Sequence, residues 1–556
     1  MNDMHHLSAL LSSDSSVAVS PKERMEMILQ ASDSKEAVRG LSTVEFYDLY
    51  HELGPSDGAV LLEYASPEQV QTCFDLDLWR NDSMSDEAMT EWTEQLLAVP
   101  DEQFAEIWNN IDPEVMALYL HRNIHLYMSE DRNDEVEIPD DESPNIAQTP
   151  DFNYWVAYPE DAEKAEVLRQ LVERLYRVFD VEKAWAILEG MHWEMATDLE
   201  ETAYRFRTER IRELGFVPRD ESAALFARVD IAREAEAMRS ATQAELYVRS
   251  YPIGEKLAAS IVAYDESDSK ECYFEKILSK VSDTETIRIQ LLSLAQQVAT
   301  YDGFQPHETD GFAESFALAV AYINIGLEYA SHEEDDVAVR ILRRVALKKL
   351  LTLGWNVTVE IGRKAKILIS RGHLSIVEDQ RMSLLTGDQR DCVEGMLCSR
   401  PRPRFSSLEP YRCMKDIQAS AMCIADVATR ELFFGEGLHK TRDDISLLAY
   451  SNDIVIGVEN VNFDNIAITV MTRRATKRCE YWGVLAPDEV PDRATILDAI
   501  SYDSLMSLFE SDVPETTRVA LRRYAHQLRD YVEESWPEAD MRPEAQYCQA
   551  LLIVEE

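Results

Sequence analysis

Apolar residues recur at three- and four-residue intervals along most of the chain, and this spacing predicts a mainly α-helical protein. Residues 166–179 show the pattern clearly, with an apolar stripe opposite a face of Arg, Gln and Glu. The same spacing predicts helices over 312–327 and 521–531. Apolar residues also recur from Val181 to Leu214, so we expect one long helix there.

Between Leu41 and Tyr127 the helices are expected to be short, because proline recurs where a helix can begin. Pro55, Pro67 and Pro113 each fit a first helical turn, where the missing N–H of proline has no intrahelical partner to lose. Helices this short are unstable alone and must bury their apolar stripes against one another. The pattern therefore predicts a superhelical repeat of short helices, followed by longer helices in the rest of the chain.

Three regions depart from helical spacing and indicate minor β content near 151–158, 355–361 and 453–470. The first is rich in aromatic residues, and the second alternates apolar and polar residues with the period of a strand. In the third, residues 453–458 and 466–470 are β-branched and could pair as a hairpin. A buried helix can carry the same short apolar runs, so helix remains the alternative for the second and third regions.

A chain of 556 residues exceeds the usual size of one hydrophobic core, so several domains are expected. Composition divides it into a flexible Ser-rich N-terminus, a short-helix repeat domain, an acidic linker with three prolines, a central helical domain and a C-terminal helical domain. In that order, the predicted parts cover residues 1–20, 21–128, 129–150, 151–375 and 376–556.

The run LSTVEFYDLYHELGPSDGAVLLEYASPEQVQTCFDLDLW, residues 41–79, resembles the short-helix superhelical repeats at the cytoplasmic amino end of MgtE-type magnesium transporters. This chain does not continue into the membrane domain of those transporters, so the resemblance implies a fold and not ion transport. As a whole, the chain resembles a family of long, acidic, helical bacterial proteins of unknown function. That second resemblance implies no activity.

The chain carries 103 acidic and 55 basic side chains, for a formal net charge of −48. Such a surface repels the phosphates of nucleic acids and anionic lipids, so we expect no nucleic-acid binding. The longest apolar stretch, Phe316–Leu327, is too short to cross a bilayer, so no membrane insertion is expected. The acidity leaves two interpretations open: a cationic partner, or a surface adapted to a saline solvent.

Cysteine usage and the first residues both favour a cytoplasmic protein. The eight cysteines are sparse and include no Cys-x-x-Cys pair, so reduced thiols are the simplest interpretation. The first twenty residues have no basic segment before their apolar positions, and a secretory signal is therefore not expected.

The segment FFGEGLHKT, Phe433–Thr441, contains the Lys-Thr pair of a phosphate-binding loop, but His439 stands where that loop needs glycine. The alternative is that Gly435 ends one helix and that Thr441 caps the next, with Asp444 at its third position. We favour the alternative.

Two Glu-x-x-His pairs, Glu189 with His192 and Glu436 with His439, resemble halves of a di-iron site, but chance accounts for them in so acidic a chain. Zinc-binding cysteines usually come in pairs about two to four residues apart, and no such pairs occur among Cys392, Cys398, Cys413 and Cys423. We therefore expect no catalytic residues, no metal site and no cofactor.

The candidate binding residues are basic. Arg400, Arg402 and Arg404 alternate with two prolines, and Arg412 follows. Proline favours an extended backbone, so the segment would present a stiff row of guanidinium groups suited to an anion or an acidic partner. The alternative is that these arginines pair with acidic side chains of the same chain.

Because no catalytic motif is present, the sequence favours a cytoplasmic helical scaffold or adaptor that binds a protein partner through the short-helix repeats. The rival hypothesis is an enzyme or small-ligand regulator with an anion site between the central and C-terminal helical domains. A converging pocket of Arg, His and carboxylate groups favours the rival, and an exposed docking surface favours the scaffold.

If the acidity is an adaptation to saline solvent, the melting temperature of the full chain should rise as salt approaches molar concentration, because screening weakens self-repulsion. Thermal unfolding followed by circular dichroism over a salt series measures this. A melting temperature that is flat or falls with salt contradicts the adaptation.

Overall fold

The computed structural model describes residues 20–80, 82–128, 145–193, 195–242, 272–282, 284–371, 384–449, 461–476, 481–509, 513–536 and 550–553. Helices predominate in these residues, so the prediction of a mainly α protein is confirmed. The predicted flexible N-terminus lies outside the described residues except for Ser20, and the predicted acidic linker lies outside them up to residue 144.

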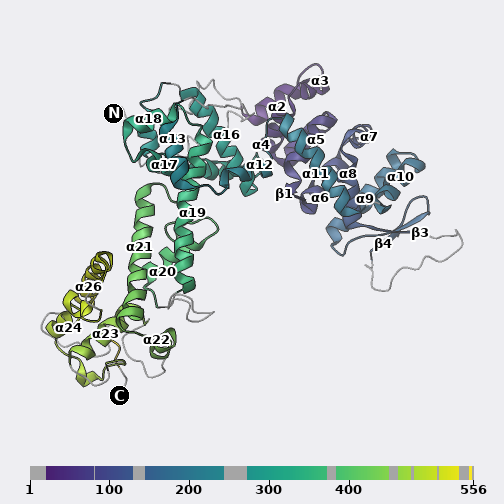
Figure 1. Cartoon of the computed structure of the whole chain (residues 1–556). Helices are drawn as coiled ribbons and strands as arrows, with labels where there is room; N and C mark the ends of the chain where they lie inside the picture. The colour runs from purple at the N-terminus through teal and green to yellow at the C-terminus, as the bar shows by residue number, and fades with distance from the viewer. Residues whose placement is uncertain are drawn as a thin grey trace. The chain divides into compact units, whose positions relative to one another are not determined.

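Packing divides the chain into two compact units. Figure 1 labels many of their helices and strands. The first unit comprises Met1–Ala227, Ser240–Val320 and Glu334–Leu351. The second comprises Arg228–Arg239, Ala321–Glu333 and Thr352–Glu556. The domain boundaries expected from composition stay a prediction.

Short helices open the first unit, as expected. They are α2 (Pro21–Leu29), α3 (Ser34–Arg39), α4 (Thr43–Leu62), α5 (Pro67–Asp77), α6 (Asp86–Ala98), α7 (Asp101–Asn110) and α8 (Pro113–Asn123). Pro67 and Pro113 stand in first helical turns, as predicted. Pro55 also stands at a helical start, because Gly54, with a non-helical φ of 76°, kinks α4 into two halves and Pro55 is the first residue of the second half.

Two small antiparallel sheets accompany the short helices, one between α5 and α6 and one after α8. One pairs β1 (Trp79–Arg80) with β2 (Ser83–Met84). The other has the order β3 (His125–Met128), β5 (Tyr154–Ala157), β4 (Ile146–Gln148), with Val156 opposite both Leu126 and Ala147. The β content expected near 151–158 is therefore present.

The single helix expected from Val181 to Leu214 is wrong. The structure has α9 (Ala162–Val178), then α10 (Val181–Trp193), and a new helix, α11 (Ala196–Glu213), after an extended Met195. Helix α10 packs on α8 and α9, whereas α11 packs on α8 and α5. The break divides one continuous apolar pattern between two helices, so that α10 can pack on α9 and α11 on α5 while both pack on α8.

The first unit also contains α12 (Arg219–Ala223), a 3₁₀ turn at Ala224–Phe226, α15 (Tyr273–Leu278), α16 (Thr284–Asp302) and α18 (Asp335–Leu342). Helix α17 (Thr309–Ser331) begins in this unit and ends in the second. The core of the first unit joins the short helices to α9, α10 and α11 through residues such as Phe46, Phe74, Leu118 and Leu171.

The second unit holds most of α13 (Ile231–Ser240) and most of α19 (Leu347–Arg371). It continues with α20 (Gly387–Leu397), α21 (Met414–Leu432), a π-helical turn at Phe433–Gly437, α22 (Arg442–Ala449), α23 (Phe463–Ala475), a 3₁₀ turn at Pro487–Glu489, α24 (Arg493–Ala499), α25 (Tyr502–Met506) and α26 (Glu515–Ser535). Residues of α23 and α26, including Phe463, Ile466, Leu521 and Leu528, share its core.

Two β expectations are wrong, and in both places the structure has a helix. Residues 355–361 lie within α19, and residues 466–470 lie within α23. Helix α23 is buried at every position from Phe463 to Thr472, including its polar residues Asn465, Thr469 and Thr472, so it has no charged, exposed face there to reveal the helical period. Residues 453–458, the other half of the predicted hairpin, lie outside the described residues.

Among the described residues, no helix has both the length and the apolar content needed to cross a membrane.

Replacing Gly354 by alanine should destabilise the chain, because a Cβ there would lie 1.9 Å from the carbonyl oxygen of Tyr322 and force α17 and α19 apart. Overpacking of this kind costs about 3 kcal/mol. Gly387→Ala is the matched control, since a Cβ at that position would have no neighbour within 4 Å among the described residues. Chemical denaturation of both variants measures the difference, and equal stability contradicts the close approach.

Candidate functional site

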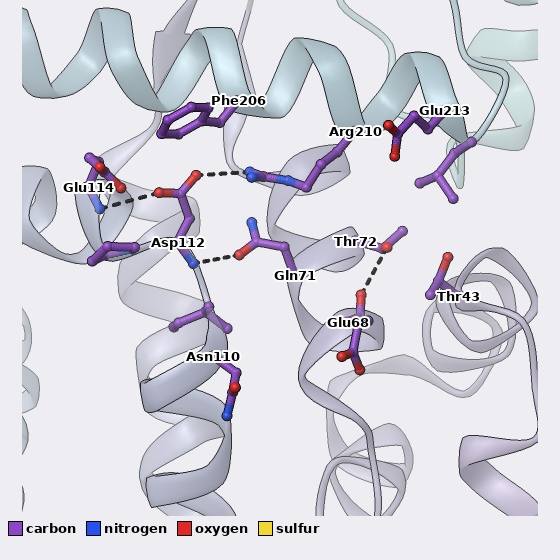
Figure 2. A pocket seen from close by; sticks show the side chains of 13 residues that line it. Thr43, Glu68, Gln71, Thr72, Asn110, Asp112, Glu114, Phe206, Arg210 and Glu213 are labelled. Atoms are coloured by element: carbon purple, nitrogen blue, oxygen red, sulfur yellow. Dashed lines mark hydrogen bonds and ion pairs between the residues drawn. The ribbon is translucent and has the colours of Figure 1, made fainter.

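The first unit contains an open pocket of about 580 Å³ where α5, α11 and the α7–α8 junction meet, with Thr43 of α4 at its edge (Figure 2). Ile111, Asp112 and Pro113 bring the α7–α8 junction into its wall, and Phe206, Arg210 and Glu213 come from α11. The pocket is therefore built by the short helices together with one later helix of the same unit.

An ion-paired network forms one wall of the pocket. Arg210 donates to both carboxylate oxygens of Asp75, at 2.7 and 2.8 Å, and to Oδ2 of Asp112 at 3.0 Å. Gln71 joins the two acids: its amide nitrogen donates to Asp75, and its oxygen accepts from the backbone N–H of Asp112 at 2.7 Å. Asp112 in turn caps α8 by accepting from the backbone N–H of Glu114.

The acids in this network are almost fully buried, with 2% of each side chain exposed for Asp75 and Asp112. Burial raises the pKa of Asp75 above its usual value, although the hydrogen bonds from Arg210 and Gln71 oppose the shift. Burial disfavours the charge of Arg210, yet its contacts with Asp75 and Asp112 outweigh that effect and raise the pKa of Arg210. The guanidinium charge is thus committed to two buried carboxylates of the same chain.

The mouth of the pocket is acidic and partly aromatic. Figure 2 shows Phe206 and Glu114 at one end and Glu68 and Glu213 at the other. Glu68 and Glu213 are exposed, and 40% of Phe206 is exposed. Over the described part of the chain, neither Glu68 nor Glu213 forms an ion pair. A ligand at this mouth therefore meets uncompensated negative charge at one end and an aromatic ring at the other.

A second polar cluster lies elsewhere in the first unit and surrounds the buried carboxylate of Asp77, the last residue of α5. His51 Nε2 lies 2.9 Å from Asp77 Oδ2, and His307 Nδ1 lies 3.7 Å from Asp77 Oδ1. The Tyr47 hydroxyl donates to Asp77 Oδ1 at 2.8 Å, and Trp92 Nε1 donates to Oδ2 at 3.1 Å. The two imidazole rings are stacked, with centroids 3.8 Å apart and planes within 1° of parallel.

Burial, and then the neighbouring His51, lower the pKa of His307 to about 4, so its ring is neutral at pH 7. Burial also raises the pKa of Tyr47, which keeps its hydroxyl proton. Since that single proton is donated to Asp77, the 2.8 Å contact between Tyr47 and His307 Nδ1 requires the imidazole to donate. The cluster offers two imidazoles and one carboxylate, a donor set that can hold a metal ion.

Two residues of the predicted arginine site, Arg402 and Arg404, contact α20. The backbone N–H of Arg402 donates to the carbonyl of Gly395, and the Arg402 guanidinium stacks on Phe405. Arg404 pairs with Asp388 at 3.3 Å, and Arg412 lies 4.0 Å from Glu409.

Arg404 and Arg412 thus have acidic neighbours from their own chain, as the alternative interpretation expects. Arg400 is half-buried and is not without a partner. An anion or acidic-partner site at Arg400, Arg402, Arg404 and Arg412 stays a prediction.

Residues of the FFGEGLHKT segment and Glu189 of the first Glu-x-x-His pair have structural roles. Thr441 and Asp444 form the expected capping pair before α22, with Thr441 Oγ1 donating to Asp444 at 2.8 Å and accepting from the Asp444 N–H at 3.3 Å. Gly435 lies inside the π-helical turn, so the expectation that it ends a helix is wrong. Glu189 accepts a short hydrogen bond from Tyr154, and the side chain of His192 lies outside the described part of the structure.

Comparison with known proteins places the chain in a family. A family model matches residues 2–553, which is nearly the whole chain. The chain belongs to DUF6178, a family of unknown function. No curated protein and no solved structure matches it. The resemblance to an uncharacterised family is thereby confirmed, and the resemblance of residues 41–79 to MgtE-type transporters is not.

Neither the pocket nor the histidine cluster of this DUF6178 chain could be found from residue spacing. Tyr47 and His307 are 260 positions apart, and Arg210 lies 135 positions from Asp75. Metal and catalytic motifs are recognisable only when their residues follow one another at fixed short intervals. The expectation that the chain has no metal site rested on such intervals and did not address residues brought together by folding.

Arg210→Met should lower the free energy of unfolding of the DUF6178 chain by about 3–5 kcal/mol, because it leaves two buried carboxylates unpaired. Arg212→Met on the same helix is the control; its partners Glu209 and Glu221 are exposed, so its loss should be within about 1 kcal/mol. Denaturant titration at neutral pH measures both losses.

The deficit of Arg210→Met should shrink as pH falls. The folded-state pKa of Asp75 already lies above its unfolded value, and losing Arg210 raises it further. A carboxyl with a raised folded pKa contributes stability at low pH that is lost as pH rises through that pKa. A deficit relative to the unsubstituted chain that is constant from neutral to mildly acidic pH contradicts this assignment.

Proposed function

We propose that this DUF6178 chain is a cytoplasmic helical scaffold or adaptor that binds a basic segment of a protein partner in the pocket between α5, α8 and α11. The observation that carries the proposal is the acidic mouth, where Glu68 and Glu213 are exposed at the end opposite Phe206 while Arg210 is held by buried acids. The proposal excludes nucleic acid as the ligand.

The chemistry of the pocket suits a lysine or arginine side chain. Such side chains have an apolar stem and a charged head, and Phe206 and Leu214 offer apolar contact near the carboxylates. A volume of about 580 Å³ is ample for a few side chains of a peptide. An anionic metabolite would instead face Glu68, Glu114 and Glu213, so this pocket does not support the rival hypothesis of an anion site.

The charge of the whole chain supports the same class of partner. A net charge of −48 attracts basic surfaces at long range and speeds their association at low ionic strength. A scaffold that presents a short-helix surface also needs no catalytic residues. Cytoplasmic location is part of the proposal and rests on the sparse cysteines.

The proposal is tested with short synthetic peptides that carry Lys or Arg beside an aromatic residue, and with acidic counterparts of the same length. Binding to the full chain is measured by isothermal titration calorimetry at low salt. We expect selective binding of basic peptides, weakened about threefold to tenfold by Glu68→Gln with Glu213→Gln. Phe206→Ala should weaken it about tenfold.

The control removes the same charge elsewhere on the first unit. Glu91 on α6 and Glu201 on α11 are exposed and do not line the pocket. The double variant Glu91→Gln with Glu201→Gln should bind the basic peptides like the unsubstituted chain, apart from a small loss of long-range attraction. Equal weakening by both double variants, or a preference for acidic peptides, rules the pocket out as the docking site.

A further inference from the structure

We propose that His51, Asp77 and His307 form a binding site for one divalent transition-metal ion of the zinc class. Their ligand atoms all lie within 4.8 Å of one another. Tetrahedral zinc holds nitrogen and oxygen ligands roughly 3.4 Å apart. His51 Nε2 lies 2.9 Å from Asp77 Oδ2, and His307 Nδ1 lies 3.7 Å from Oδ1 of the same carboxylate. Two imidazoles and one carboxylate leave a fourth position for water or another ligand.

The carboxylate at the centre of the site is held in place by groups outside the ligand set. Asp77 accepts from the Tyr47 hydroxyl on one oxygen and from Trp92 Nε1 on the other. Such supporting donors fix the direction of a metal-binding carboxylate and raise the affinity of its site. Tyr47 and Trp92 are therefore positioning residues, and neither is a ligand.

The two histidine ligands are accessible from outside the protein. The side chains of His51 and His307 are 20% and 31% exposed, so the ring edges can be reached from solvent. Asp77, with 8% of its side chain exposed, lies behind them.

Binding requires one local change. The rings are parallel, so their in-plane lone pairs lie in parallel planes and do not meet at one point. His307 lies between the end of α16 at Asp302 and the start of α17 at Thr309, whereas His51 lies within α4. We infer that the His307 ring turns out of the stack, releases Tyr47, and carries its proton on Nε2 so that Nδ1 can bind the ion.

The competing explanation is that the same residues only satisfy a buried carboxylate with hydrogen bonds. It predicts the same packing but no affinity for metal. The site is separate from the pocket of the proposed function, because none of the three ligands lines that pocket.

The test uses the full-length chain after chelator treatment, titrated with Zn²⁺ against a chromophoric chelator and with Co²⁺ by visible spectroscopy. We expect one ion per chain and Co²⁺ bands typical of nitrogen and oxygen ligands. His307→Ala should weaken binding at least about tenfold, and Trp92→Phe, which removes the donor to Asp77 and keeps a smaller aromatic ring at that position, should weaken it about tenfold. Absence of stoichiometric binding to the unsubstituted chain overturns the proposal.

His125→Ala is the matched control, because His125 is an exposed histidine of β3 in the same unit. It should leave the affinity unchanged. Circular dichroism of each metal-free variant shows whether it is folded, and if His307→Ala is not, Trp92→Phe and the Co²⁺ spectrum still decide. Binding by folded His307→Ala equal to that by His125→Ala overturns the site. Glu68→Gln with Glu213→Gln should not change metal affinity, so the two proposals can fail independently.

Discussion

Helix α5 buries two carboxylates in its last three residues, Asp75 and Asp77, and several elements of the first unit supply the hydrogen-bond donors and the cation that these carboxylates need. Asp75 and Asp77 lie at the end of the helix where the backbone dipole disfavours negative charge, and both are shielded from water. A buried carboxylate is tolerated only when donors or cations meet it. The partners come from α4, α6, α11 and the turn before α17, as well as from Gln71 of α5 itself.

Asp75 and Asp77 contact different partners. The contacts of Asp75 help to form the wall of the pocket, and those of Asp77 form the histidine cluster. Asp75 meets Arg210, which also reaches Asp112 and so ties α11 to α5 and to the start of α8. Because Asp75 and Asp112 engage the Arg210 guanidinium, it does not form an ion pair with the exposed Glu68 or Glu213 at the pocket mouth. Asp77 meets Tyr47, His51 and Trp92 through hydrogen bonds, with His307 nearby, which places two imidazoles beside a fixed carboxylate.

The spacing of neighbouring residues predicted individual helices well, but it did not predict which distant residues the fold brings together. Pro67 and Pro113 in first turns, the Thr441–Asp444 capping pair and the stripe of α9 depend on neighbouring residues, and they form as the sequence indicates. The helical period of α23 was not recognisable because the helix is buried on all sides. The break between α10 and α11 was not predicted because the apolar pattern continues across Met195. The role of Arg210 could not be predicted, because its partners Asp75 and Asp112 are far away in the sequence.

The central claim is that Arg210 and Asp75 stabilise the first unit as a pair, and a double-mutant cycle tests it most directly. The free energies of unfolding of Asp75→Asn, Arg210→Met and the double variant are compared with that of the unsubstituted chain. We predict that the double variant is less destabilised than the sum of the two single variants, with a coupling of about 2–3 kcal/mol. Additivity to within about 0.5 kcal/mol would contradict the account.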